Sequence, residues 1–168
     1  MDFEYIISLV MPTYNRAEEI QVSIRTLLDT LPESIFKNKI ELIILDNGSN
    51  YNVDDILKDI VILSKKKLTL RIIKNGENIG NDDNFLKGLC EARGKYILQC
   101  SDRYYYNIDF LSLIPILEGE TSNCIIFSDR FRKYTKTAIT INNSYKDEWL
   151  KEEFIITILE KAVSKEDF

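Results

Sequence analysis

The chain has 168 residues, of which 45% are hydrophobic and 29% are charged, and residues 1–168 are expected to form a single domain with a sizeable buried core. Because the sequence contains no histidine, catalysis by Ser-His-Asp or Cys-His groups and zinc sites built on imidazole are excluded. The net charge of −5 offers no electrostatic footprint for nucleic acid, so we expect no nucleic-acid partner.

Short apolar runs predict buried strands, and stretches of helical periodicity separate them. The strands are expected at residues 6–11, 40–45, 68–74 and 95–100, and the helices around residues 20–31, 53–61 and 85–90. Asn15 with Glu18 resembles a capping box at the start of the first helix. Asn81 is expected to cap the third helix, and Gly94 is expected to end it.

The pattern is less regular in the last third of the chain. Residues 108–117 are predicted to be helical although they include Pro115, Cys124–Ser128 is predicted to be a strand, and Asp147–Val163 is predicted to be an amphipathic helix. Continuous apolar strands separated by helices indicate a mostly parallel sheet that is covered on both faces. The predicted fold is therefore a Rossmann-like three-layer α/β/α sandwich.

Polar residues follow each of the four early strands, at the point where the strand ends. The carboxyl ends of parallel strands meet at one edge of a sheet, and ligands usually bind there. We therefore expect Thr13, Asp46 and Asp102 to converge on a single crevice.

The three cysteines, Cys90, Cys100 and Cys124, each lie in an apolar stretch and show no C-x-x-C spacing. This pattern predicts buried thiols in a reducing compartment. No apolar run approaches the roughly 18–20 residues that span a bilayer, and the N-terminus is acidic where a signal peptide is basic. The chain is therefore expected to be cytoplasmic and to have no transmembrane segment.

Two loops have alternative interpretations. Pro12–Arg16 leads into a helix, so its backbone N–H groups suit an anion or a ligand carbonyl, or Asn15 simply caps the helix. Asp46 is either a carboxylate that accepts N–H groups of a nucleobase or an exposed turn former.

The later loops leave similar alternatives open. Lys74 and Asn78 either reach a phosphate or belong to a solvated turn. Asp102 either holds a hard cation that bridges a diphosphate or caps a turn. Tyr104, Tyr105 and Tyr106 either stack on a ring or cover the crevice.

The segments ISLVMPTYNRAEEI, IELIILDNGSN and KNGENIGNDDNFLKGLCEARGKYILQCSD resemble the successive motifs of family-2 glycosyltransferases, which have the A-type nucleotide-sugar fold. The resemblance covers residues 5–130. It implies that the nucleoside is contacted by Pro12, Thr13, Tyr14 and Asn15, that Asp46 recognises the base, and that Asn78 and Gly80 lie near it. It also implies that Asp102 opens a D-x-D motif holding a divalent cation, Mg²⁺ or Mn²⁺, on the sugar diphosphate.

The sequence departs from this family in two places. The D-x-D position is Asp102-Arg103-Tyr104, so the second carboxylate is missing, and the chain ends at Phe168, whereas family members usually continue into an acceptor site. Arg103 either pairs with a phosphate, supplying part of the missing charge, or points to solvent. The inverting mechanism that the resemblance implies needs a carboxylate base; Asp129 and Asp147 are candidates, and each is also interpretable as a solvated side chain.

Three functions follow from these observations. The first is a hexosyltransferase-like enzyme that moves a sugar from a nucleotide-diphosphate sugar to a glycan or lipid-linked acceptor in bacterial surface polysaccharide synthesis, at the inner face of the cell membrane with peripheral association. The second is a non-catalytic nucleotide-sugar-binding remnant or regulatory domain of the same fold. The third is a flavodoxin-like regulatory domain with Asp46 as phosphoacceptor.

Overall fold

The computed structural model describes residues 3–106, 110–119, 124–128, 139–140 and 155–160. Strands and helices alternate first: β1 (Tyr5–Thr13), α1 (Ala17–Asp29), β2 (Ile40–Asp46), α2 (Val53–Ser64), β3 (Thr69–Lys74), α3 (Asn81–Glu91) and β4 (Gly94–Gln99). They are followed by α4 (Phe110–Gly119), β5 (Cys124–Ser128), β6 (Ile139–Thr140) and β7 (Ile155–Glu160). The elements predicted before residue 130 are all present, with ends shifted by a few residues.

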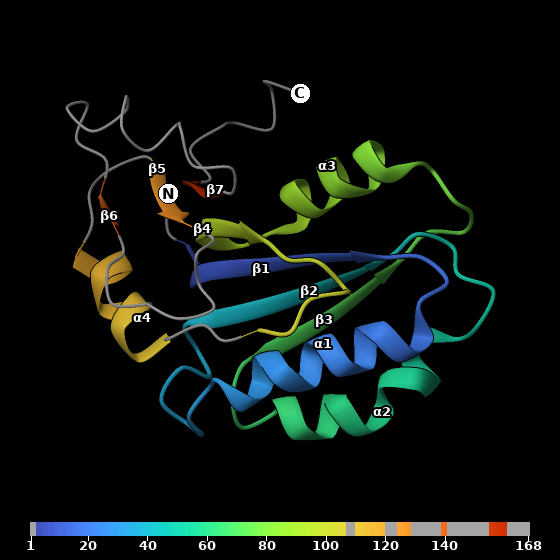
Figure 1. Ribbon diagram of the computed structural model, residues 1–168, viewed down its shortest axis with the longest axis horizontal. Helices are drawn as coiled ribbons and strands as arrows, with labels where there is room; N and C mark the ends of the chain where they lie inside the picture. Colours follow the sequence, from blue (N-terminus) through green and yellow to red (C-terminus); the bar gives the residue numbers. More distant parts are fainter. Residues whose placement is uncertain (1–2, 107–109, 120–123, 129–138, 141–154, 161–168) are drawn as a thin grey trace.

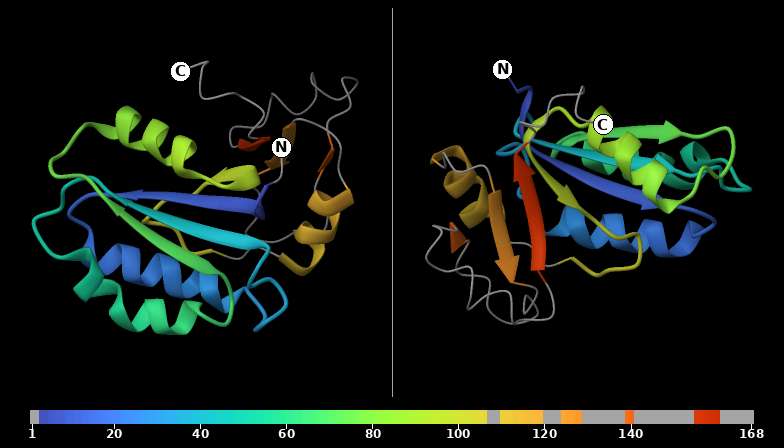
Figure 2. Two further views of the ribbon diagram at one scale, coloured as in Figure 1. Left: turned by 180° about the vertical axis from the view of Figure 1, so that it is seen from behind. Right: turned by 90° about the horizontal axis from the view of Figure 1, so that it is seen from above.

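One sheet runs through the molecule in the order β3-β2-β1-β4-β7-β5-β6. Its first four strands pair in parallel, and β7, β5 and β6 extend it with antiparallel pairs. The helices α1 and α2 lie on one face of the parallel part and α3 lies on the other (Figures 1 and 2). The predicted three-layer α/β/α sandwich is confirmed.

The central strands are apolar on both faces because both faces are covered. Every residue of β2 is buried. Leu42 and Ile44 belong to the core that includes the inner faces of α1 and α2, whereas Ile43 and Leu45 belong to a second, smaller core to which α3 contributes. This explains why β2 has a continuous apolar run in place of strict alternation.

The strand order predicts a crevice beyond the carboxyl ends of the paired strands β1 and β4. The chain adds β2 and β3 on one side of β1 and then returns to add β4 on the other side. In parallel sheets a crevice forms where the strand order reverses in this way, beyond the carboxyl ends of the strands. The order also differs from that of flavodoxin-like domains, in which the first strand lies between the second and the third.

The predicted C-terminal helix is wrong where the structure describes it. Ile155–Glu160 forms β7, which pairs antiparallel with both β4 and β5, while residues 147–154 and 161–163 lie outside the described residues. The segment is rich in isoleucine and threonine, whose branched side chains favour strands. Hydrogen bonding to the edges of β4 and β5 therefore favours a strand here, although the sequence has helical periodicity.

The predicted helix caps are also wrong. The N-cap of α1 is Arg16, without a side-chain hydrogen bond, because Asn15 has a positive φ of 53° and its Oδ1 accepts a hydrogen bond from Asn50 N at 2.8 Å. The N-cap of α3 is Gly80, with a φ of 91°, in place of Asn81. Gly94 begins β4; a Cβ there would lie 2.5 Å from Ser8 N, so this glycine serves the close approach of two strands.

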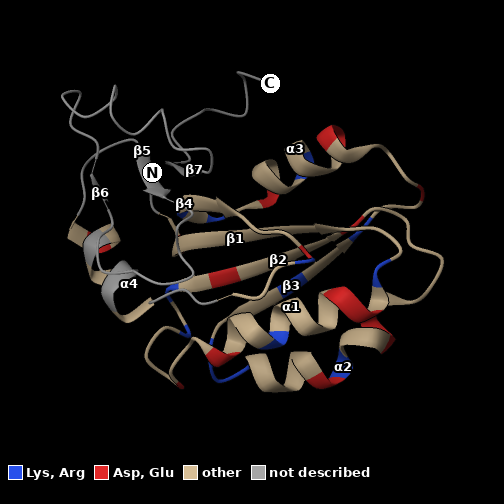
Figure 3. Ribbon diagram, viewed as in Figure 1, with Lys and Arg blue, Asp and Glu red and all other residues tan. Residues whose placement is uncertain are grey.

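Acidic residues lie at the N-terminal ends of the first three helices (Figure 3). The first turns of α1, α2 and α3 carry pairs of acidic residues, which interact favourably with the positive end of each helix. None of the described helices has the length and apolar character needed to cross a membrane.

The described cysteines differ in their exposure to solvent. Cys100 is buried as expected, whereas Cys90 is exposed on α3, so the prediction of a buried thiol is wrong there. The side chain of Cys124 lies outside the described part of the structure.

Candidate functional site

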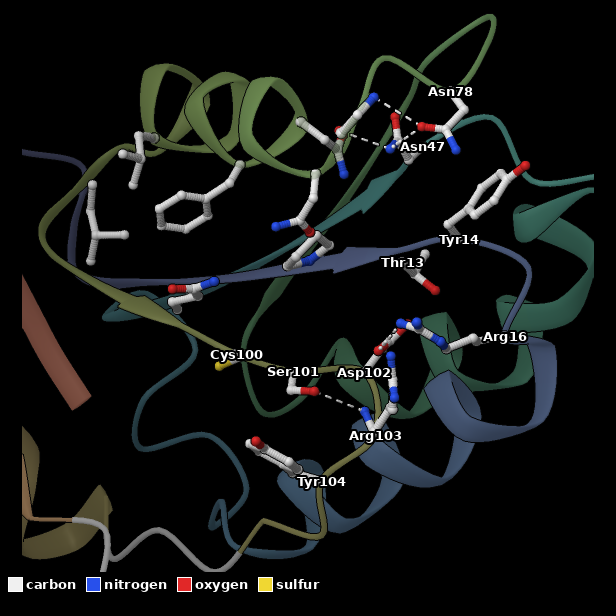
Figure 4. A pocket seen from close by; sticks show the side chains of 18 of the residues that line it. Thr13, Tyr14, Arg16, Asn47, Asn78, Cys100, Ser101, Asp102, Arg103 and Tyr104 are labelled. Carbon is white, nitrogen blue, oxygen red and sulfur yellow. Dashed lines mark hydrogen bonds and ion pairs between the residues drawn. The ribbon is translucent and has the colours of Figure 1, made fainter. Parts of the chain in front are cut away.

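A pocket of about 950 Å³ opens beyond the carboxyl ends of β1 and β4 (Figure 4). Its walls come from the loop between β1 and α1, from the N-terminal part of α3 and its preceding loop, and from the segment that follows β4. Six of the eight side chains predicted to bind a nucleotide line it: Pro12, Thr13, Tyr14, Asn78, Asp102 and Arg103. The strand reversal between β1 and β4 has thus brought together residues ninety positions apart.

The other two predicted residues are not in the lining. Asn15 turns toward the loop after β2, where its backbone N donates to Ser49 Oγ at 2.9 Å. Asp46 lies opposite Thr13 in the β1–β2 register, and its Oδ1 accepts a hydrogen bond from Ser49 N at 3.1 Å. Only 4% of Asp46 is exposed, so the expectation of an exposed turn aspartate is wrong; it lies behind Thr13 and supports the loop.

Thr13 ends β1 at the pocket. It is 2% exposed, and its Oγ1 is the one buried side-chain oxygen or nitrogen in the described part of the chain that has no hydrogen-bond partner. A buried hydroxyl without a partner costs free energy. Thr13 therefore lines the pocket with a hydroxyl whose hydrogen-bonding capacity is unused among the described residues.

Arg16 and Asp102 form an ion pair across the pocket. Arg16 Nη1 donates to both carboxylate oxygens of Asp102, at 3.0 and 3.2 Å. The Asp102 side chain is 3% exposed and that of Arg16 is 33% exposed, so the carboxylate is enclosed while the guanidinium reaches the pocket. The sequence placed Arg16 at the end of the predicted Pro12–Arg16 loop, but its side chain was assigned no role.

A network of asparagines holds the opposite wall. Asn47 Nδ2 donates to Asn78 Oδ1 at 2.9 Å and to the Gly80 carbonyl at 3.0 Å. Asn47 Oδ1 accepts from Asn75 Nδ2 at 3.1 Å, and Asn75 also donates to Asn84 Oδ1 at 2.8 Å. These bonds fasten the loops after β2 and β3 to α3. Asn47 lines the pocket and was missed because the adjacent Asp46 drew the functional interpretation.

Lys74 does not reach the pocket. Its Nζ forms an ion pair with Asp54 and donates to Asn52 Oδ1 at the start of α2. This surface pairing favours the solvated-turn interpretation of Lys74 over the phosphate one.

The three consecutive tyrosines, Tyr104 to Tyr106, differ in burial and in their contacts. Tyr106 OH donates to the Ser101 carbonyl at 2.7 Å and accepts from Ser101 N at 2.6 Å, which braces the segment after β4. Burial raises the pKa of Cys100, beside it, to about 12, and burial also raises the pKa of Tyr106. Tyr104 is exposed and lines the pocket, whereas Tyr105 is exposed outside it.

The described residues do not fit a divalent cation held by the protein. Asp102 is the only carboxylate among the described lining residues, and both of its oxygens already accept from Arg16. No group of three or more acidic or cysteine side chains in the described part of the chain is arranged to hold an ion. The predicted metal role of Asp102 therefore has no support in this geometry.

The parallel sheet with flanking helices defines the protein as an α/β domain of the A-type nucleotide-sugar fold, and solved structures show this likeness. S. aureus TarS 1-349 superimposes with a TM-score of 0.65 at 18% identity, covering 93% of this chain and 47% of that one. The mannosyltransferase PcManGT from Pyrobaculum calidifontis, in complex with GDP-Man and Mn²⁺, gives a TM-score of 0.59 at 12% identity, covering 76% of this chain and 38% of that one.

The profile of glycosyl transferase family 2 matches residues 8–158, and the chain belongs to that family. An uncharacterized glycosyltransferase from Methanocaldococcus jannaschii is 30% identical over 92 residues, which are 55% of this chain and 30% of that protein. The chain thus spans less than half the length of these relatives. The interpretation as a flavodoxin-like regulatory domain is wrong, because both the family and the strand order contradict it.

Proposed function

We propose that this domain binds a nucleotide-diphosphate sugar in the pocket between β1 and β4 and acts as the donor-binding part of a glycosyltransferase. The observation that carries the proposal is the buried, unpartnered hydroxyl of Thr13 in the wall of that pocket. It lies within the segment Pro12–Asn15, where the family resemblance puts the nucleoside. Three residues further along the same loop, the guanidinium of Arg16 offers positive charge for phosphates.

Solved relatives support the class of ligand. S. aureus TarS 1-349 in complex with UDP-GlcNAc has a TM-score of 0.55 at 22% identity, covering 70% of this chain and 32% of that one, and PcManGT is in complex with GDP-Man. At these identities the fold alone is shared, so they support a nucleoside diphosphate in general. Asn78 is proposed to lie near the base. Asp46 is proposed to read the base, since its Oδ2 has no partner among the described residues.

The proposed reaction transfers the sugar to a glycan or lipid-linked acceptor in surface polysaccharide synthesis, at the cytoplasmic face of a membrane. An acceptor hydroxyl attacks the anomeric carbon, the bond from that carbon to the phosphate oxygen breaks, and its electron pair leaves with the diphosphate. A carboxylate takes the hydroxyl proton. The two candidate bases, Asp129 and Asp147, lie outside the described residues.

The second candidate function is nucleotide-sugar binding without turnover. It is favoured by the segment Asp102-Arg103-Tyr104, in which the second carboxylate of the D-x-D motif is missing. Both candidate functions require binding of the nucleotide sugar. Only the transferase releases a nucleotide diphosphate, so this release distinguishes the two functions.

A thermal-shift panel of UDP, GDP, CDP, ADP and dTDP, and of their sugars, tests the proposal. A ligand at a hundred times its Kd should stabilise the fold by about 2.7 kcal/mol. Thr13→Val should reduce the shift, whereas Thr69→Val on β3, where the hydroxyl donates to the Lys37 carbonyl at 3.5 Å outside the pocket lining, should not. No shift with any nucleotide would contradict the proposal. Release of nucleotide diphosphate from a bound sugar, followed by chromatography, distinguishes transfer from binding alone.

A further inference from the structure

The pocket presents two guanidinium groups and no free carboxylate among its described residues. Arg16 uses Nη1 for Asp102, while its Nε and Nη2 donors have no partner in the described part of the chain. Arg103 is exposed and lines the same pocket, and its side chain forms no ion pair with any described residue. Figure 4 shows the Arg103 side chain extending toward the Arg16–Asp102 pair.

This arrangement suits an anion with several oxygens. Arg16, Arg103 and Asp102 place two positive charges and one negative charge on this wall, which leaves an excess of positive charge. A guanidinium matches a phosphate with two parallel hydrogen bonds. A metal ion placed at Asp102 would meet a carboxylate whose oxygens are already bound and a guanidinium beside it. The charges on this wall therefore favour a diphosphate over a cation.

We propose that Arg16 and Arg103 bind the diphosphate of the donor directly, so that donor binding needs no divalent cation, and that Asp102 is a positioning residue which orients Arg16. This inference rests on the proposed function. It assigns to Arg103 the charge that a metal ion supplies where the D-x-D motif is complete. Arg16 is held in place before the ligand arrives, which reduces the ordering cost of binding.

Calorimetry with the nucleoside diphosphate that gives the largest thermal shift tests this, in excess chelator and in excess Mn²⁺ or Mg²⁺. We expect similar Kd values in all three conditions. In chelator, Arg103→Ala and Arg16→Ala should each weaken binding roughly ten- to a hundredfold, and should weaken binding of the parent nucleoside much less. Arg93→Ala is the matched control, because its side chain pairs with Glu4 outside the pocket and its removal should leave Kd unchanged.

The positioning role of Asp102 has its own readout. Asp102→Asn should weaken diphosphate binding in the wild-type background and have little further effect when Arg16 is already alanine, which is the coupling that a double-mutant cycle measures. A purely structural role would lower binding equally in both backgrounds and would lower nucleoside binding too.

Two outcomes overturn the inference while the proposed function stands: binding that requires Mn²⁺ or Mg²⁺, and binding in chelator that Arg103→Ala leaves intact. Absence of nucleotide binding in every condition would overturn both.

Discussion

Two buried carboxylates in the described part of the chain pair with arginine, one on β2 and one in the segment after β4, and they differ in how many hydrogen bonds they accept. Glu41, in the middle of the sheet beneath the end of α3, is fully buried. It accepts from Ser8 Oγ at 2.5 Å, from Arg93 N at 2.6 Å and from Arg71 Nη1 at 3.2 Å. Asp102, at the carboxyl edge, has the single described partner Arg16, which faces the pocket.

The difference separates a structural network from a ligand site. Around Glu41 both carboxylate oxygens are used within the protein, and their partners are bound further: Ser8 Oγ also accepts from Gly94 N at 2.7 Å, and Arg71 also binds Glu91. Around Asp102 the donors of Arg16 and Arg103 and the hydroxyl of Thr13 remain unused in the described structure. We call the Glu41 group the closed network and the Asp102 group the open network. A closed network stabilises the fold, whereas the unused donors of an open network can form hydrogen bonds with a ligand.

Glu41→Ala is expected to have the largest effect on stability. It leaves Arg71, Arg93 N and Ser8 Oγ without their shared acceptor inside the sheet, and breaking such a buried pair costs about 3–5 kcal/mol. Urea denaturation followed by circular dichroism measures the loss.

Asp102→Ala provides the comparison for that experiment. Because Arg16 is a third exposed and water can replace its lost partner, we expect a cost of about 1 kcal/mol. Equal losses for the two variants would erase the distinction between the closed and the open network.

Asp46→Ala is expected to have an intermediate effect on stability, since Asp46 is buried beside Thr13 and outside the pocket lining. Asp46→Ala removes the acceptor of Ser49 N, so it should lower the free energy of unfolding by about 1–3 kcal/mol, contrary to what an exposed turn residue predicts. Asp46→Asn keeps an oxygen for Ser49 and should preserve most of the stability.

If Asp46 reads the base, Asp46→Asn should nevertheless weaken nucleotide binding by about 1.5–3 kcal/mol. Calorimetry alongside denaturation measures both quantities. Unchanged binding in a stable Asn variant would leave Asp46 with a purely structural role.

Ser8 and Thr13, both on β1, allow the Glu41 network and the pocket to be compared through the loss of a single hydroxyl. Ser8→Ala removes two hydrogen bonds of the closed network and should cost about 1–3 kcal/mol of stability without changing nucleotide affinity. Thr13→Val removes a hydroxyl that has no described partner, so stability should stay equal or rise, while nucleotide affinity falls about two- to tenfold. Denaturation and calorimetry on both variants test this; the opposite pattern would show that the pocket hydroxyl is structural.

The smallest effect on stability near neutral pH is expected from Cys100, which lines the pocket. Burial raises the pKa of Cys100 from its ordinary value of 9.0 to about 12, and the pKa of Tyr106 is also raised. The thiol therefore ionises in the unfolded chain at a lower pH than in the folded one. Its contribution to stability is complete below about pH 9 and is lost as the pH rises toward 12.

The urea midpoint should fall as the pH is raised from about 8 to 11, and Cys100→Ala should make the midpoint less dependent on pH. Alkylation offers a second measurement: a thiol reagent at mildly alkaline pH should label the exposed Cys90 before Cys100. Rapid labelling of Cys100 in the folded protein would indicate that the pocket floor is open to solvent.

Much of the fold and part of the site could be predicted from the sequence because the signals were local. Apolar runs and helical periodicity located the strands and helices up to residue 128, and polar strand ends pointed to Thr13, Asn78 and Asp102, which do line one pocket. The helix ends were missed because Asn15 and Gly80 adopt positive φ values; these residue types permit that conformation, but loop packing decides whether it is adopted.

The remaining features depend on residues that are distant in sequence. Ile155–Glu160 became a strand because β4 and β5 offered it hydrogen-bonding edges. Arg16 and Asp102 are 86 residues apart, and only the return of the chain to add β4 beside β1 brings them within 3.0 Å. The sequence by itself determined which residues could carry charge or hydrogen bonds; the strand order decided which of them meet, because pairing across a sheet depends on the whole chain and not on neighbouring residues.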